Sequence, residues 1–235
     1  MRMRETDGNV VFLERDYIGG ASSSFGAKLH RHPLLELYAA CDGSSHVALE
    51  SGVLEGGMIA IGPGAVHAIA DSGKRGIALF IDPLSDFGYT LTKNALRDQR
   101  VRVLEAPPSP DGDIRQAAAR MIGLVSGEAH TRPFDDAILR AVELLNEDDC
   151  LFDMDALASG VYLSKSRLAH LFSAQTGITL KDYIQYKRLE RACRRMLRGA
   201  SITDAAFDTG FAGSSHIASS SMKLTGLQLR RLLGL

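Results

Sequence analysis

The chain has 235 residues, of which 45% are hydrophobic and 23% are charged, together with 23 glycines and 7 prolines. This composition is ordinary for a globular protein with one large domain or two of about 100 to 130 residues, and it excludes collagen-like and disordered chains. The cysteines Cys41, Cys150 and Cys193 form no CxxC pair, which argues against a disulfide framework or a zinc ribbon. No apolar run reaches the roughly 18 residues of a transmembrane helix, so we expect a cytoplasmic protein without a membrane partner.

Charge is distributed unevenly along the chain, although the formal net charge is only -1. From Leu151 to Leu235, twelve Lys and Arg residues stand against six Asp and Glu residues, whereas the first 150 residues carry a net charge of -7. A basic C-terminal third joined to an acidic remainder indicates a module that binds a polyanion, attached to a module with a different partner.

The N-terminal part, up to about residue 105, is predicted to be an all-β sandwich or barrel. Short apolar runs alternate with turn residues in stretches such as HVALESGVLEGGMIAIGPGAVHAIADSGKRGIALFI. The segment Pro107–Asp113, with the sequence PPSPDGD, is rich in turn formers and predicts a boundary. We therefore assign residues 1–106 to a β domain and residues 107–132 to a linker and a helix.

Two short motifs of this β domain contain residues that can bind a metal. The stretch LHRHPLLELY carries His30, His32 and Glu36, and the stretch GGMIAIGPGAVHAI carries His67. These stretches resemble the two motifs of a cupin barrel, the first of which reads H-x-H-x3-E-x6-G and ends at Gly43. In the second motif, the spacing from proline to histidine is one residue shorter than in metal-binding cupins.

The spacing of these residues has a physical interpretation of its own. On one extended strand, His30, His32 and Glu36 would project from the same sheet face because their positions share parity. With His67 from a neighbouring strand, they would supply three imidazoles and one carboxylate, which suits Zn, Fe, Mn, Ni or Cu. Pro33 argues against a regular strand, and the histidines could instead be polar partners of an organic effector or hydrogen-bonded core groups.

Beyond the boundary, the apolar spacing becomes helical. It predicts one helix over residues 114–125 and a second from Asp135 to about Asn146. The apolar stripe of the first helix must be covered by something, either the β domain or a second subunit. A homodimer is therefore one of two alternatives.

Residues 133–235 are predicted to contain two helix-turn-helix units. In Leu157–Gly177, with the sequence LASGVYLSKSRLAHLFSAQTG, one helix ends near Gly160, Ser164 caps the next helix and Gly177 ends it. The same plan returns in Ile202–Gly226. A long basic helix, LKDYIQYKRLERACRRML, connects the two units.

This C-terminal part resembles the DNA-binding domain of AraC/XylS-type transcription regulators. The resemblance rests on an ordered set of positions at the spacing of that family: Leu157, Ala158, Ser164, Leu168, Phe172, Gly177, Tyr183, Arg188, Leu189, Ala192, Leu197, Ile202, Ala206, Gly210, Phe211, Ser215 and Gly226. In that family, each unit inserts one recognition helix into successive major-groove segments of a single DNA face. Cupin-like sensor domains commonly precede this domain, so the two resemblances support each other.

The resemblance also implies which residues contact DNA. In the first recognition helix, Arg167 and His170 would contact base edges, and Lys165 would lie near the backbone. In the second, short hydroxyls and one imidazole offer only permissive hydrogen bonding, so the first unit should dominate base recognition. The predicted DNA-binding residues are Lys165, Ser166, Arg167, Ala169, His170, Lys187, Arg188, Ser214, Ser215, His216, Ser219 and Lys223.

The second unit departs from the family pattern at two positions. Ser221 stands where a core Phe is usual, and Leu229 stands where the closing turn has Pro. The run Ser219–Ser221 is also a poor helix former. These departures raise the alternative of a partner-binding protein that has lost its affinity for DNA.

The interpretation favoured by the whole sequence is a two-domain α+β regulator rather than an enzyme. A cupin-like barrel would sense a small molecule or metal, the helix-turn-helix pair would bind double-stranded DNA, and RNA polymerase is expected as a protein partner. The main alternative is a metal-dependent cupin enzyme, a dioxygenase or an isomerase, fused to an ancillary helical domain. Its support is limited to the four candidate ligands.

Overall fold

The computed structural model describes residues 2–6, 9–22, 26–41, 43–70, 75–105, 113–147 and 152–233. The chain divides into two compact units. Unit 1 comprises Met1–Thr131 together with Ser221–Leu235, and unit 2 comprises Arg132–Ser220. Most of the predicted boundary segment, residues 107–112, lies outside the described residues, as does Cys150.

Unit 1 is built on two antiparallel β-sheets. Among the described residues, the larger sheet has seven strands in the order β1-β2-β3-β10-β5-β8-β11, and the smaller has four in the order β4-β9-β6-β7. The strands are β1 (Arg2–Thr6), β2 (Asn9–Leu13), β3 (Tyr17–Ser22), β4 (Ala27–His30), β5 (Leu35–Ala40), β6 (Ser45–Leu49), β7 (Gly52–Gly56), β8 (Met58–Ile61), β9 (His67–Ile69), β10 (Gly76–Ile81) and β11 (Val101–Leu104).

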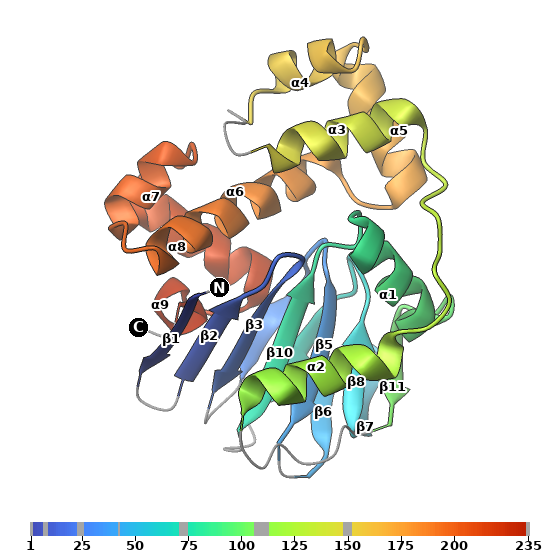
Figure 1. Cartoon of the computed structure of the whole chain (residues 1–235), viewed down its shortest axis with the longest axis vertical. Coiled ribbons are helices and arrows are strands. Elements are labelled where there is room, and N and C mark those ends of the chain that lie inside the picture. Colours follow the sequence, from blue (N-terminus) through green and yellow to red (C-terminus); the bar gives the residue numbers. More distant parts are fainter. Residues whose placement is uncertain are drawn as a thin grey trace. The chain divides into compact units, whose positions relative to one another are not determined.

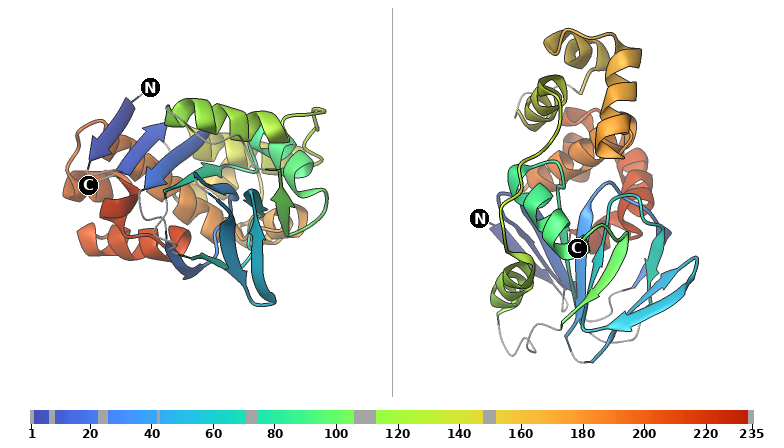
Figure 2. Two further views of the ribbon diagram at one scale, coloured as in Figure 1. Left: turned by 90° about the horizontal axis from the view of Figure 1, so that it is seen from below. Right: turned by 90° about the vertical axis from the view of Figure 1, so that its right-hand side faces the viewer.

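Residues up to 105 form mainly β-strands, as predicted, but the all-β prediction is wrong at Asp86–Leu96, which form a helix, and the predicted closed barrel is not found. Over the described residues, the strands form two open sheets. Helices α1 (Asp86–Leu96) and α2 (Ile114–Val125) cover one face of the larger sheet, and the smaller sheet lies on its other side (Figures 1 and 2). Strand β5 is therefore buried on both faces, which explains its almost continuous apolar sequence.

Alternation along β5 decides which side chains face which layer. Leu35, Leu37 and Ala39 belong to the hydrophobic core that includes α1 and α2. Because successive side chains of a strand point to opposite faces, Glu36 projects from the other face, toward the smaller sheet. A carboxylate is thereby placed between the two sheets.

Helix α2 forms at the predicted residues, and the β domain covers its apolar stripe. Asp113 caps the helix, and its side chain accepts a hydrogen bond from the backbone N of Arg115. The stripe packs into the core of the larger sheet, so a second subunit is not needed to cover it. Its buried residues are Ile114, Ala117, Ala118, Met121 and Val125.

Unit 2 is helical, and the predicted cap at Ser164 and the predicted helix end at Gly177 are confirmed. Side chains of Asp153, Ser164, Thr179 and Ser201 cap successive helices, and Gly177 ends α5 with a positive φ of 71°. The helices of this region are α3 (Asp136–Asn146), α4 (Met154–Gly160), α5 (Lys165–Thr176), α6 (Leu180–Leu197), α7 (Ile202–Asp208), α8 (Ser214–Thr225) and α9 (Leu229–Leu232). Helix α8 begins in unit 2 and ends in unit 1, to which α9 also belongs.

In the part of the chain that the structure describes, no helix is both long and apolar enough to cross a lipid bilayer.

The packing of α2 on the sheet is testable by truncating one side chain from each of its faces. Met121 is fully buried, whereas Leu124 on the same helix is 45% exposed. We expect Met121→Ala to lower the free energy of unfolding by about 2 to 5 kcal/mol, because it leaves a cavity in a packed core. Leu124→Ala should change it by less than about 0.5 kcal/mol.

Denaturant titration of the two variants measures these values. Size-exclusion chromatography of both variants tests the alternative that α2 forms a dimer interface. A smaller effect of Met121→Ala than of Leu124→Ala, or dissociation of a dimer by either variant, would contradict the packing of α2 described here.

Candidate functional site

Four titratable side chains meet in the interior of unit 1. His30 ends β4, His67 begins β9, and the register of the two strands places them opposite each other with ring centroids 4.2 Å apart. The chain then leaves the smaller sheet, passes through residues 31–34 and enters the larger sheet at β5. His32 lies in this connection and Glu36 on the inner face of β5, so the cluster lies between the two sheets.

The prediction that His30, His32 and Glu36 share one extended strand is wrong. The strand ends at His30, and residues 31–34, which include Pro33, carry the chain from one sheet to the other. His30 and Glu36 therefore lie on strands of different sheets. The cluster forms because the chain crosses between the sheets, and not because its residues share parity.

The Glu36 carboxylate is the centre of the hydrogen bonding. Its Oε2 accepts from His32 Nε2 at 2.9 Å and from His67 Nε2 at 3.0 Å, and the residue has no exposed surface. Burial alone would raise the pKa of this carboxyl, but the hydrogen bonds from the two imidazoles outweigh it and hold the pKa well below its usual range. Glu36 is therefore an anion inside the protein.

His67 supplies the positive charge that this anion needs. Its Nδ1 donates to the carbonyl oxygen of Ala65 at 3.0 Å while its Nε2 donates to Glu36, so both ring nitrogens carry a proton. Burial lowers the pKa of His67, but the hydrogen bond and charge of Glu36 outweigh burial and raise it above its ordinary value. The pair is a buried imidazolium and carboxylate.

His30 is neutral and presents a free lone pair. Its Nδ1 donates to the carbonyl oxygen of Lys28 at 2.7 Å, and its buried Nε2 has no hydrogen-bond partner. Burial, and then the charge of His67, lower the pKa of His30 to about 4. Glu36 Oε1 is likewise buried and without a partner.

The cluster has the ligands of a metal site. Among the described residues, His30, His32, Glu36 and His67 offer one ligand atom each, and these atoms all lie within 4.8 Å of one another. Two of the buried acceptors in the cluster, His30 Nε2 and Glu36 Oε1, are unpartnered. A cation fits such a donor set, because each unpartnered atom carries a lone pair and no proton.

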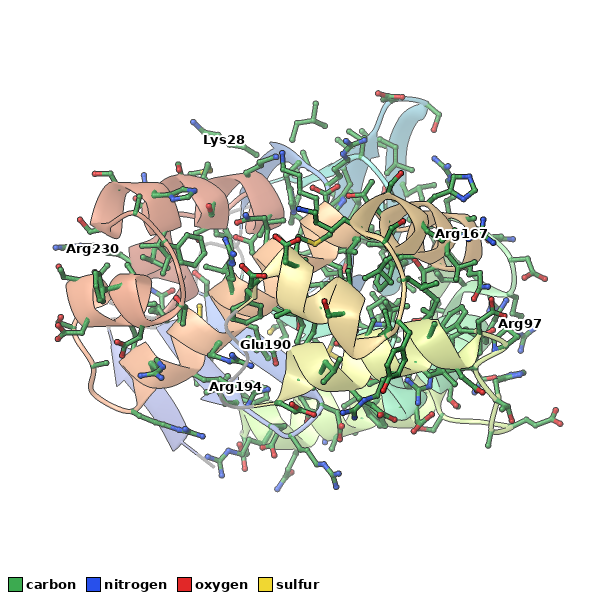
Figure 3. All side chains as sticks on the ribbon, turned by 90° about the horizontal axis from the view of Figure 1, so that it is seen from above. Lys28, Arg97, Arg167, Glu190, Arg194 and Arg230 are labelled. Atoms are coloured by element: carbon green, nitrogen blue, oxygen red, sulfur yellow. The ribbon has the colours of Figure 1, made fainter. Side chains whose placement is uncertain are left out.

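Helix α5 presents the residues predicted to read DNA in the first unit. Leu168 and Phe172 are fully buried, and the opposite face is open to solvent. Arg167 extends from this open face (Figure 3), and Lys165 pairs with Asp155 at 2.9 Å. Exposed on the helix are Lys165, Ser166, Arg167 and His170, with Ala169 partly exposed.

Helix α8 presents the corresponding residues of the second unit. Ile217 and Leu224 are buried, and the exposed residues are Ser214, Ser215, His216, Ser219 and Lys223. The helix continues without interruption through Ser219–Ser221, although these residues are poor helix formers.

Ser221 occupies the interior position where a Phe was expected. It is fully buried, and its hydroxyl donates to the carbonyl oxygen of Leu227 at 3.0 Å. Leu229, at the position where a Pro was expected, is buried in the first turn of α9. The polar replacement is therefore hydrogen-bonded in the interior of the second unit.

A helix-turn-helix domain model matches residues 157–233, which include α5 and α8. The chain carries an AraC-type DNA-binding domain. A similar curated protein is the bifunctional transcriptional activator/DNA repair enzyme Ada of Escherichia coli, which is 34% identical over 98 residues. That alignment covers 40% of this chain and 27% of Ada, so the chain spans about a quarter of the length of this relative.

The fold as a whole is similar to that of ToxT from Vibrio cholerae. One ToxT structure has a TM-score of 0.58 at 10% identity, covering 93% of this chain and 98% of ToxT. A structure of ToxT with a bound unsaturated fatty acid has a TM-score of 0.54 at 10% identity, covering 92% of this chain and 98% of that protein. At this level of identity the likeness is one of fold.

Two predicted DNA-contacting residues of the AraC-type domain have their charges engaged within the chain. Lys187 is only 7% exposed, and its amine forms an ion pair with Glu190. Arg188 donates to the carbonyl oxygen of Phe152 at 3.0 Å and lies over the Phe152 ring. Lys187, a predicted DNA contact, therefore has its charge buried against a carboxylate in this structure.

Glu190 was not identified from the sequence, although it organises the charges of α6. It accepts from Arg194 Nη2 at 2.8 Å and Nε at 3.1 Å, and its side chain lies beside that of Arg194 (Figure 3). Burial raises its pKa, but the charges of Lys187 and Arg194 outweigh burial and lower it. The signal was available, since Glu190 lies three residues from Lys187 and four from Arg194, which are contact spacings on a helix.

We expect Glu190→Gln to lower the free energy of unfolding at neutral pH by about 1.5 to 3 kcal/mol, because charged hydrogen bonds are lost. Since the pKa of Glu190 is lowered in the folded protein, the advantage of the wild type is full above the ordinary carboxyl pKa of 4.5. It should disappear as the pH falls through the lowered pKa. Denaturant titrations at several pH values measure both effects.

The matched control is Glu143→Gln on α3, where an exposed carboxylate pairs with Arg140. This change should cost less than about 0.5 kcal/mol, as is usual for surface ion pairs. Equal losses in the two variants at neutral pH would contradict the role given to Glu190.

Proposed function

We propose that this protein is a transcription regulator whose affinity for its operator depends on a cation bound by His30, His32, Glu36 and His67. The observation that carries the proposal is the pair of unpartnered acceptors, His30 Nε2 and Glu36 Oε1, in a buried cluster attached to an AraC-type domain. The regulator would act by linkage, because a ligand that binds one conformation better than another shifts the population toward it.

The DNA-binding half of the proposal rests on α5 and on charge. Arg167 and His170 lie on the open face of a helix whose opposite face is packed, as a recognition helix requires. Arg is suited to bidentate hydrogen bonding with guanine in the major groove. The hydroxyls of α8 offer weaker discrimination, so α5 should carry most of the sequence preference.

The sensing half rests on the chemistry of the cluster. A bound divalent ion would be held by three imidazoles and one carboxylate. It would take the place of the protons that the Nε2 atoms of His32 and His67 donate to Glu36, because a metal-binding nitrogen must be unprotonated, and it would supply positive charge beside Glu36 in their stead. The ligand set suits Zn, Fe, Mn, Ni or Cu. The two sequence motifs that supply these ligands are the basis on which we assign the β domain as cupin-like.

An organic acid is the second candidate effector, since ToxT, which is similar in fold, has been seen with an unsaturated fatty acid. The unpartnered atoms of this cluster argue against a carboxylate in the same place. Both are acceptors, and they lie in a cluster that already contains the Glu36 anion. A cation, or a ligand that donates hydrogen bonds, satisfies them, whereas a second carboxylate would be repelled.

The same ligand set would also suit a metal-dependent dioxygenase or isomerase. Metal analysis combined with oxygen uptake separates the two functions, because a regulator should bind metal without turnover.

The DNA-binding half is tested by selecting a preferred duplex from random sequences and measuring its affinity for variants. We expect Arg167→Ala to weaken binding to the preferred duplex by about 1 to 3 kcal/mol while leaving nonspecific binding nearly unchanged. Arg140→Ala removes the same charge from an exposed position on α3 and serves as the control. Equal losses on every duplex would reject a base contact by Arg167.

The sensing half is tested by thermal unfolding of the full chain with and without Zn. We expect Zn at one hundred times its dissociation constant to stabilise the wild type by about 2.7 kcal/mol. His30→Ala and His67→Ala should lose most of this response, because each removes a ligand. His46→Ala should keep it, since His46 lies on the same sheet, partly exposed, and pairs with Glu55.

The comparison uses the change in stability that Zn causes in each variant, and not the stability of the metal-free variants. Removing His67 lowers that stability by itself, because it leaves the Glu36 carboxylate without its positively charged partner. An identical response in all three variants would show that Zn binds elsewhere.

A further inference from the structure

The C-terminal end of α8 packs against strand β4. The segment Ser221–Leu235 belongs to the same compact unit as the β domain. The pairing of β4 with β9 shifts register between Ala27 and His30, and within this irregularity Lys28 N donates to the carbonyl oxygen of Gly226 at 3.3 Å. Lys28 lies beside the end of α8 in Figure 3.

Gly226 leaves no room for a side chain at this contact. A Cβ atom there would lie 2.6 Å from His30 Nδ1, 2.7 Å from the carbonyl oxygen of Lys28 and 3.0 Å from the Cβ of Ala27. Gly226 also has a positive φ of 65°, which favours glycine on its own account. Two separate requirements therefore select glycine, and one of them is the imidazole of a candidate metal ligand.

The first helix-turn-helix unit provides a comparison that separates the two requirements. Gly177 ends α5 in the same way, with a φ of 71°, but nothing lies within 4 Å of the Cβ that it lacks. The positive φ is thus common to both helix ends, whereas the close approach to His30 belongs to Gly226.

Lys28 connects Gly226 to the cluster through two hydrogen bonds of its backbone. The carbonyl oxygen of Lys28 accepts from His30 Nδ1, and the backbone N of Lys28 donates to Gly226. The His30 ring is therefore fixed from its Nδ1 side, and its free Nε2 belongs to the cluster with Glu36 and His67. Groups that orient a metal-binding imidazole in this way commonly alter metal affinity when they are changed.

We propose that Gly226 is a positioning residue for His30, through which cation binding at the cluster and the placement of the end of α8 are coupled. The inference rests on the proposed metal site and adds the route by which that site reaches the second recognition helix. Coupling between two equilibria is reciprocal. If cation binding favours one position of the end of α8, then that position of α8 increases the affinity of the cluster for the cation. The hydroxyls predicted to contact DNA, from Ser214 to Ser219, lie on the same helix.

The test compares Zn affinity of the full-length wild type, Gly226→Ala and Gly177→Ala by isothermal titration calorimetry. Both substitutions impose the same backbone strain, but only Gly226→Ala displaces His30. We expect Gly226→Ala to weaken Zn binding by about 10 to 100-fold and Gly177→Ala by less than about twofold. Thermal unfolding of the metal-free proteins confirms that each variant is folded.

The outcomes separate the two proposals. If the wild type binds no Zn, the metal site is wrong and this inference fails with it. If all three proteins bind Zn with the same affinity, the metal site stands and the positioning role of Gly226 is overturned. Weakening by both substitutions to the same extent would also overturn it, because strain alone would then explain the effect.

A measurement on the wild type alone covers the case in which Gly226→Ala does not fold. We expect Zn to slow amide hydrogen exchange at residues 222–229, because fixing His30 also fixes its contacts with Gly226. Residues 173–180, at the end of α5, serve as the internal control and should not change. Zn binding without added protection at residues 222–229 would contradict the coupling.

Discussion

The buried negative charge of Glu36 is the constraint around which unit 1 is arranged. A carboxylate with no exposed surface is costly unless it is paired and hydrogen-bonded. Its partners, His32 and His67, come from the connection between the sheets and from the smaller sheet, so the charge requirement fixes one sheet against the other. The proton on His67 meets this requirement in the structure described here, and a metal cation would meet it in the proposed bound form.

Some of the positive charges in unit 2 are paired within the chain and others are exposed, and the net charge does not distinguish the two kinds. Lys187 and Arg194 neutralise Glu190, Arg195 pairs with Asp208, and Arg188 holds the carbonyl of Phe152. These cations stabilise the helix that connects the two helix-turn-helix units. The positive charge that remains exposed is therefore smaller than the composition of the basic third indicates, and it includes Arg167, Lys181 and Lys223.

The sequence was most informative where local chemistry decides structure. The cap Ser164 and the helix-ending Gly177 act within a few residues, and α5 begins and ends where these signals place it. The four residues of the cluster were found from their chemical type. Their arrangement was not, because the crossing between sheets at residues 31–34 is a tertiary event with no periodic signal.

The closed barrel was wrong for the same reason, since local strand patterns do not specify which edges pair. The contact of Gly226 with His30 joins residues 196 positions apart in the sequence. It was not predicted, because the position of Gly226 at the end of a helix already explained the choice of glycine. Ser221 looked like a defect because the carbonyl of Leu227 that satisfies it could not be seen in the sequence.

Helix α8 belongs to both units, so a tilt of the helix at its C-terminal end displaces its N-terminal end. Its 12 residues span about 18 Å, so a tilt of about 5° at Gly226 would move the opposite end by roughly 1.5 Å. A hydrogen bond to a base edge tolerates only a few tenths of an ångström. Under the proposal that Gly226 positions His30, a small rotation of one imidazole ring is therefore amplified along α8 toward the hydroxyls that are predicted to contact DNA.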